Sequence, residues 1–81
     1  MQTFVYASHR KPDTYVWLRD QDRFDVLPTE LSARLGELRF VLAVELTPER
    51  QLPRADVATV LADLQRQGWH LQLPPADATI G

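Results

Sequence analysis

The part of the sequence that decides the fold is residues 52–75, which read LPRADVATVLADLQRQGWHLQLPP. Its first half predicts an amphipathic helix, because four aliphatic residues recur at i, i+3, i+4 and i+7 and therefore share one face. These residues are Val57, Val60, Leu61 and Leu64. Gly68 follows where a helix commonly ends in a left-handed residue. No capping side chain stands near Arg54, so we expect Pro53 and the charge of Asp56 to define the start.

A short strand is expected directly after this helix. Apolar and polar residues alternate over positions 69–73, and a period of two is typical of a half-buried strand. We expect Trp69, the first residue of the strand, to pack against the helix that it follows. Prolines at positions 74 and 75 end the pattern, because proline cannot donate a ladder hydrogen bond.

The N-terminal region predicts an antiparallel hairpin. Residues 3–7 (TFVYA) and 14–19 (TYVWLR) are rich in the β-branched and aromatic residues that strands favour. The polar segment SHRKPD, residues 8–13, joins them as a loop. In the second strand, alternation places Tyr15 and Trp17 together on one face.

Two further elements are expected between the hairpin and the long helix. A short helix of about two turns follows Pro28 and ends at Gly36. Residues 39–46, RFVLAVEL, then form the most apolar run of the chain and do not alternate. A continuous apolar run predicts a strand that is covered on both faces and is therefore central in its sheet.

These elements predict an α+β fold with the order β-β-α-β-α-β. The strand–helix–strand unit over residues 40–73 would make its two strands parallel if they share a sheet. A central strand needs helices on both faces, so we expect a three-layer α/β/α sandwich. Its sheet would be four-stranded and mixed, with the N-terminal antiparallel hairpin. A single domain is expected over residues 1–75, with residues 76–81 as a flexible C-terminal tail.

Composition narrows the class of protein. A chain of 81 residues forms one small domain, and the lack of cysteine excludes disulfides and thiolate metal sites. The N-terminus does not resemble a signal peptide, and no apolar run approaches the ~18 residues of a membrane span. We therefore expect a cytoplasmic protein without a membrane partner. The net charge of −2 argues against a surface wholly adapted to nucleic acid.

Several segments together resemble the YcgL-domain family, which consists of small uncharacterised proteobacterial proteins. The matching residues are Tyr6, Ser8, Lys11, Tyr15, Val16, Trp17, Phe24, Pro28, Leu31, Gly36, Asp56, Val57 and the run QGWHLQLPP at positions 67–75, apart from His70. The likeness reaches nearly the whole chain, and the closing run is its most specific part. The resemblance implies an α/β/α sandwich and no established catalytic residues. The chain departs from the family pattern at Arg54, where a polar cap is usual. It also ends soon after Pro75, where some members run on, so we expect any third helix built from that tail to be missing.

No motif points to catalysis, a cofactor or a metal. Asp20, Asp22 and Asp25 form D-x-D-x-x-D, but a calcium loop would need glycine and glutamate at its sixth and twelfth positions. We expect a solvated acidic turn in which one aspartate caps the following helix. His9 and His70 are expected to be surface histidines, because two nitrogens do not complete a zinc site. Neither a hydrolase elbow nor a phosphate loop is present, so we expect no enzyme.

The predicted hairpin supplies the candidate contact surface. Basic residues at its tip and far end accompany aromatic residues along its strands: Tyr6, His9, Arg10, Lys11, Tyr15, Trp17 and Arg19. Aromatic side chains beside basic residues can stack single-stranded bases, although these aromatics could equally form core beneath a helix. We expect a non-enzymatic interaction module with an unidentified protein partner. The alternative is an RNA-associated accessory protein, a function also suggested by relatives encoded near a ribonuclease-type gene.

Overall fold

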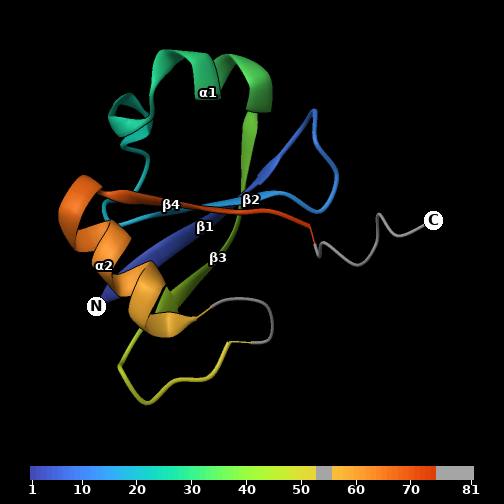
Figure 1. Cartoon of the computed structure of the whole chain (residues 1–81). Helices are drawn as coiled ribbons and strands as arrows, with labels where there is room; N and C mark the ends of the chain where they lie inside the picture. Colours follow the sequence, from blue (N-terminus) through green and yellow to red (C-terminus); the bar gives the residue numbers. More distant parts are fainter. Residues whose placement is uncertain (53–55, 75–81) are drawn as a thin grey trace.

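The computed structural model describes residues 1–52 and 56–74. The elements in chain order are strands β1 (Gln2–Ser8) and β2 (Tyr15–Leu18), the 3-10 turn η1 (Phe24–Val26), helix α1 (Thr29–Leu35), strand β3 (Leu38–Glu45), helix α2 (Val57–Gln67) and strand β4 (Trp69–Gln72). Figure 1 shows these elements along the chain. The predicted α+β class and β-β-α-β-α-β order are confirmed, with η1 as an addition. No helix in the described ranges is long and apolar enough to cross a membrane.

The four strands form one sheet in the order β3-β1-β2-β4. All three neighbouring pairs are antiparallel, so the N-terminal hairpin is confirmed and the prediction of a mixed sheet is wrong. The predicted central position of β3 is also wrong, because β1 and β2 occupy the centre and β3 lies at an edge. The chain crosses from β3 through α2 to β4 at the opposite edge, where β4 runs antiparallel to β3.

A β-bulge explains why the apolar run of β3 misled the sequence interpretation. Val5 pairs with Leu42 and the next residue, Tyr6, pairs with Phe40, which leaves Val41 as an extra residue in β3. Phe40, Val41 and Leu42 are 48%, 43% and 45% exposed. A consecutive apolar run therefore marks a bulged edge strand here and not a strand covered on both faces.

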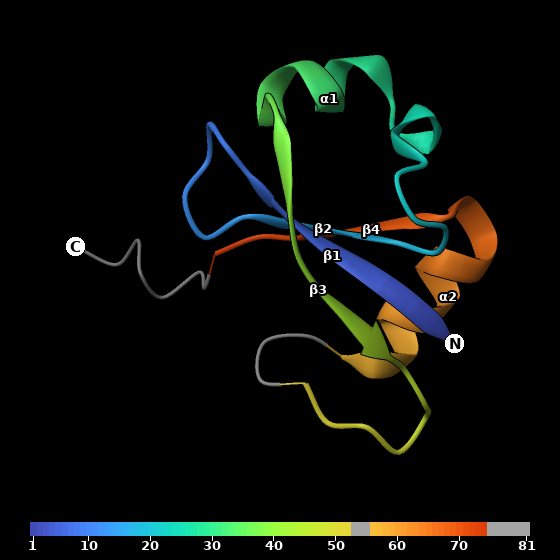
Figure 2. The same cartoon turned by 180° about the vertical axis from the view of Figure 1, so that it is seen from behind.

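Buried side chains gather in two clusters, one on each face of the sheet. The α2-side cluster consists of Val5, Trp17, Val44, Leu46, Val60 and Leu64. The α1-side cluster consists of Tyr6, Val16, Leu18, Leu27 and Leu35. The two helices lie on opposite sides of the sheet in both views (Figure 1 and Figure 2). Each helix thus covers part of a different face.

The ends of α2 agree in part with the sequence interpretation. Gly68 ends the helix in a left-handed conformation with φ of 90°, which confirms the predicted stop. The residue at the N-cap is Asp56, whereas it was expected inside the first turn; Pro53 and Arg54 lie outside the described residues. Trp69 packs with the α1-side cluster, so its predicted packing against α2 is wrong.

The end of β4 is described as far as residue 74. The strand itself ends at Gln72, and Leu73 is 62% exposed. Proline 75 and the predicted tail over residues 76–81 lie outside the described residues.

Candidate functional site

The aromatic residues of the β1–β2 hairpin lie on two different faces of the sheet. Tyr6 pairs with Val16, and Val5 pairs with Trp17, so the rings of Tyr6 and Trp17 project in opposite directions. Tyr6 is 1% exposed and Trp17 is 6% exposed. Tyr15 is half-buried at the margin of the α2-side cluster. These aromatics therefore do not form one exposed stacking surface.

Tyr6 connects the sheet to the acidic loop. Its ring makes edge-to-face contacts with Phe24 and Phe40, at centroid distances of 5.0 and 5.7 Å. Its hydroxyl donates a hydrogen bond to Asp22 Oδ1 at 2.9 Å and accepts one from the Asp22 N–H at 2.9 Å. Burial raises the pKa of the Tyr6 hydroxyl above its ordinary value of 10.0. Tyr6 thus has a structural role in holding this loop.

Two basic residues of the predicted contact surface bind helix C-termini. Arg10 Nη1 donates to the carbonyl of Ala33 near the end of α1, at 3.2 Å. Arg19 Nη1 donates to the carbonyl of Leu64 near the end of α2, at 3.3 Å. Carbonyls in the last turn of a helix, such as that of Ala33, have no partner within the helix. The Leu64 carbonyl also accepts from the Gly68 N–H at 3.0 Å, so Arg19 is a second donor to it. Both arginines thus contact groups of the fold itself.

The remaining basic residues of the hairpin tip are open to solvent. His9 and Lys11 are exposed, and the backbone N–H of His9 donates to the carbonyl of Glu37 at 2.9 Å. A polar hollow of about 450 Å³ lies beside this tip, lined by Ala7, Ser8, His9, Glu37, Leu38 and Arg39. The seven predicted contact residues therefore do not lie together. The three aromatic residues are divided between the α1-side and α2-side clusters, two arginines contact helix ends, and His9 and Lys11 lie at the hairpin tip. A role for them in binding a partner or RNA stays a prediction.

The acidic turn is held by local pairs. Asp20 accepts from Arg19 Nε at 3.3 Å, and Asp25 accepts from Arg23 Nε at 2.9 Å. The hydrogen bond from Arg23 lowers the pKa of Asp25. The expected aspartate cap is absent, because Arg23 stands at the N-cap of η1 and Pro28 at that of α1. In residues 1–52 and 56–74, no three acidic or histidine side chains group as metal ligands.

The two histidines are in separate places and have different surroundings. His70 lies on β4, and its Nδ1 is 2.8 Å from Asp63 Oδ2 on α2. Asp63 also accepts from Arg66 Nη2 at 3.1 Å. The hydrogen bond with His70 is the main cause of a lowered pKa for Asp63, and the contact with Arg66 acts in the same direction. The cluster links α2 to the last strand.

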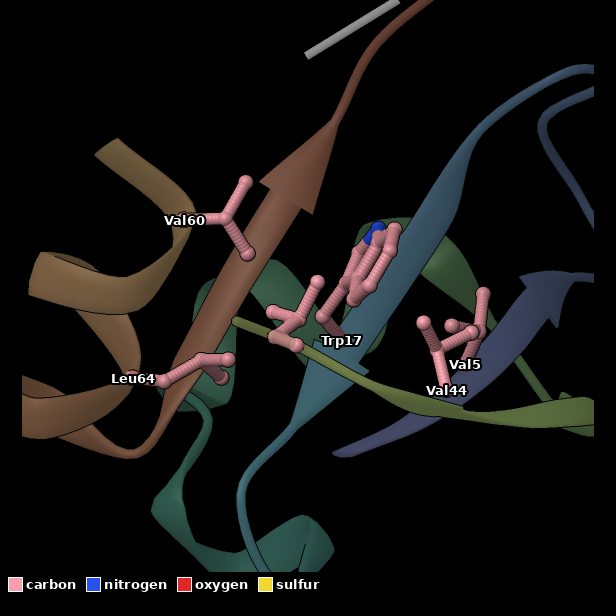
Figure 3. Close-up of a cluster of buried hydrophobic side chains, with 6 residues drawn as sticks. Val5, Trp17, Val44, Val60 and Leu64 are labelled. Atoms are coloured by element: carbon pink, nitrogen blue, oxygen red, sulfur yellow. The ribbon is translucent and has the colours of Figure 1, made fainter. Parts of the chain in front are cut away.

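An open apolar hollow lies on the α2 side of the sheet and is called here the β3 groove. It is a hollow of about 460 Å³ lined by Val5, Tyr15, Trp17, Val41, Leu42, Val44, Arg50, Leu52 and Gln72. Figure 3 shows Trp17 projecting from β2 towards the side on which Val60 and Leu64 of α2 lie. The bulge contributes to the groove, because it places the consecutive residues Val41 and Leu42 in the same lining.

Sequence reasoning found part of this groove. Tyr15 and Trp17 were among the predicted contact residues and do line it. Val41 and Leu42 were assigned to a buried strand, and Arg50 was not among the predicted contact residues. The apolar run was a usable signal, but periodicity reports burial and not position in the sheet, so it could not identify an edge strand.

Comparison of the sequence with known proteins identifies the family to which the chain belongs. The sequence model of the YcgL domain matches residues 3–75. The chain belongs to the YcgL-domain family. A YcgL domain-containing protein of Thioalkalivibrio sulfidiphilus is 51% identical over 75 residues, which are 93% of each chain. One from Xanthomonas oryzae is 49% identical over 81 residues, covering 100% of this chain and 94% of the relative. The resemblance stated from the sequence is thereby confirmed, and the names of these YcgL relatives give no activity.

Proposed function

We propose that this YcgL-domain protein is a non-enzymatic, cytoplasmic interaction module that binds another protein through the β3 groove. The observation that carries the proposal is the exposure of Val41 and Leu42, which are 43% and 45% exposed beside an apolar floor. Exposed apolar patches of this kind commonly mark contact sites for other proteins. The proposal includes the expected three-layer α/β/α sandwich. In that arrangement, the β3 groove lies between α2 and the edge of the sheet and stays uncovered.

A protein partner fits the groove better than RNA does. The ring of Tyr6 is buried on the other face, and Trp17 is only 6% exposed, so neither offers an open face on which a base could stack. Among the described residues, Arg50 is the one basic residue in the groove lining. Binding of the phosphate backbone usually requires several cations. RNA association therefore stays the alternative prediction.

The proposal is tested by capture of partners with a groove variant and a matched control. Leu42→Asp places a charge in the groove lining, and Leu73→Asp makes the same change at an exposed leucine outside that lining. We expect a defined protein to be captured by the parent chain and by Leu73→Asp, and its yield to fall at least about tenfold with Leu42→Asp, or ~1.4 kcal/mol. Circular dichroism establishes that both variants fold.

Capture that is equal with Leu42→Asp would refute the assignment of the groove. The RNA alternative is tested separately, by a gel shift of single-stranded RNA at ~50 mM salt, where phosphate contacts are strong. Absence of a shift with the parent chain would reject it. If a shift occurs, Lys11→Glu should weaken it, because Lys11 is an exposed cation at the hairpin tip.

A further inference from the structure

The β3 groove has a cationic residue in its lining. Arg50 is exposed, and its backbone N–H donates to the carbonyl of Thr47 at 3.0 Å, which closes a turn after β3. Arg50 is one of the residues that line the groove. It has no ion pair with another residue in the described part of the chain, its exposed neighbour Glu49 included. Within residues 1–52 and 56–74, no carboxylate occupies the guanidinium group.

A second donor lies on the rim of the same groove. Gln72 Oε1 accepts a hydrogen bond from the indole Nε1–H of Trp17 at 3.1 Å. The oxygen of the amide is thereby used, and its nitrogen is the group left to donate. This nitrogen has no hydrogen bond to another residue within 1–52 and 56–74. The rim therefore presents donors, one of them charged, above a floor formed by Val5, Trp17 and Val44.

The shape of the groove favours a segment of chain over a small molecule. A pocket for a small ligand usually encloses most of the ligand surface. Here two lining residues, Val41 and Leu42, remain nearly half exposed and belong to an edge strand. An extended peptide beside an edge strand directs alternate side chains to one face, where they can enter such a groove.

Resting on the proposed function, we infer that the β3 groove binds an extended peptide segment of the partner that carries a carboxylate beside its apolar side chains. One or two apolar side chains fill the floor over Trp17 and Val44. The carboxylate binds Arg50, whose planar guanidinium group matches carboxylate geometry. The Gln72 amide nitrogen adds a neutral hydrogen bond. The β3 groove thus selects its peptide by negative charge as well as by apolar side chains.

The test uses two synthetic pools of octapeptides with blocked ends. In the first pool, aliphatic or aromatic residues alternate with threonine or serine and one position is aspartate; in the second, asparagine replaces that aspartate. Binding is followed by NMR on the full chain through the two indole N–H signals. Trp17 lies in the groove and Trp69 lies in the cluster on the opposite face, so Trp69 is an internal control.

We expect the acidic pool to shift the Trp17 indole signal without shifting that of Trp69. Its apparent affinity should be about tenfold higher than that of the asparagine pool, which corresponds to ~1.4 kcal/mol. Arg50→Gln should abolish this preference. Arg34→Gln, which removes an exposed arginine from α1, should keep it.

The other outcomes overturn the inference and separate it from the proposed function. Equal affinity for both pools, or an unchanged preference in Arg50→Gln, would reject the carboxylate while leaving a groove that binds protein. A Trp17 signal that neither pool moves at millimolar concentration would reject the peptide. Concentration-dependent dimerisation that is lost in Leu42→Asp would assign the groove to a second copy of the chain. The proposed function fails on a different result, capture of the partner unaffected by Leu42→Asp.

Discussion

The hydroxyl of Tyr6 should contribute measurably to stability, and Tyr6→Phe isolates that contribution. The variant keeps the buried ring and its contacts with Phe24 and Phe40, and it removes two hydrogen bonds to Asp22. A hydrogen bond contributes about 0.5–1.5 kcal/mol net, so the expected loss is ~2 kcal/mol. For a domain of this size, that corresponds to a fall in the melting temperature of roughly 8–16 °C.

The measurement is urea unfolding at pH 7, with Tyr15→Phe as the matched control. Tyr15 is half-buried, and its hydroxyl makes no hydrogen bond to another described residue, so the control should lose less than about 0.5 kcal/mol. Equal losses in the two variants would refute the reasoning, since they would mean that water replaces Asp22 at no cost.

The stability difference between the parent chain and Tyr6→Phe should also depend on pH in the alkaline range. Burial raises the pKa of Tyr6 above 10.0 in the folded protein, so the unfolded chain releases this proton first as the pH rises. The stability that the Tyr6 hydroxyl contributes is therefore present below pH 10 and is lost as the pH rises through the folded pKa. The difference between the parent chain and Tyr6→Phe should shrink above about pH 10. A difference that stays constant would contradict this explanation.

Three further predictions concern the rest of the fold. Gly36→Ala should cost roughly 2–3 kcal/mol in urea unfolding, because Gly36 has φ of 70° and its Cβ would lie 2.7 Å from Arg10 Cγ. Trp17→Ala should cost about 3–5 kcal/mol, since the ring is buried in the α2-side cluster. Asp63→Asn should cost ~1 kcal/mol at pH 6 through a weaker contact with His70. Because the pKa of Asp63 is lowered, this cost should vanish as the pH falls from the ordinary value of 3.8 through the folded pKa.

Each of these has a matched comparison. Gly68→Ala should cost only ~1 kcal/mol, from the strain of alanine at φ of 90°, because the nearest atom of a residue distant along the chain lies 3.7 Å from the added Cβ. Phe40→Ala should cost less than Trp17→Ala, since Phe40 is 48% exposed. Asp20→Asn, on an exposed loop, should change stability by less than about 0.5 kcal/mol at any pH from 3 to 7. Equal effects within any pair would contradict the mechanism given for it.

Three residues of the predicted contact surface also make contacts within the fold that the sequence did not reveal. Arg10 and Arg19 looked like free cations in the sequence, but each donates to a helix carbonyl that is distant along the chain. The sequence contains no local pattern for such a bond, because donor and acceptor are 23 and 45 positions apart. Tyr6 was grouped with Tyr15 and Trp17 in one contact surface, yet the pairing of β1 with β2 places it on the other face from Trp17.

The sequence by itself determined the local elements of this protein. Alternation over residues 3–7 and 14–19 gave the hairpin, the aliphatic stripe gave α2, and Gly36 and Gly68 gave the two helix ends. Only the tertiary structure decided that β3 is a bulged edge strand and that Val41, Leu42 and Arg50 line one groove. The physical reason is that periodicity records which side of an element is buried, whereas strand neighbours and bulges depend on contacts between distant parts of the chain.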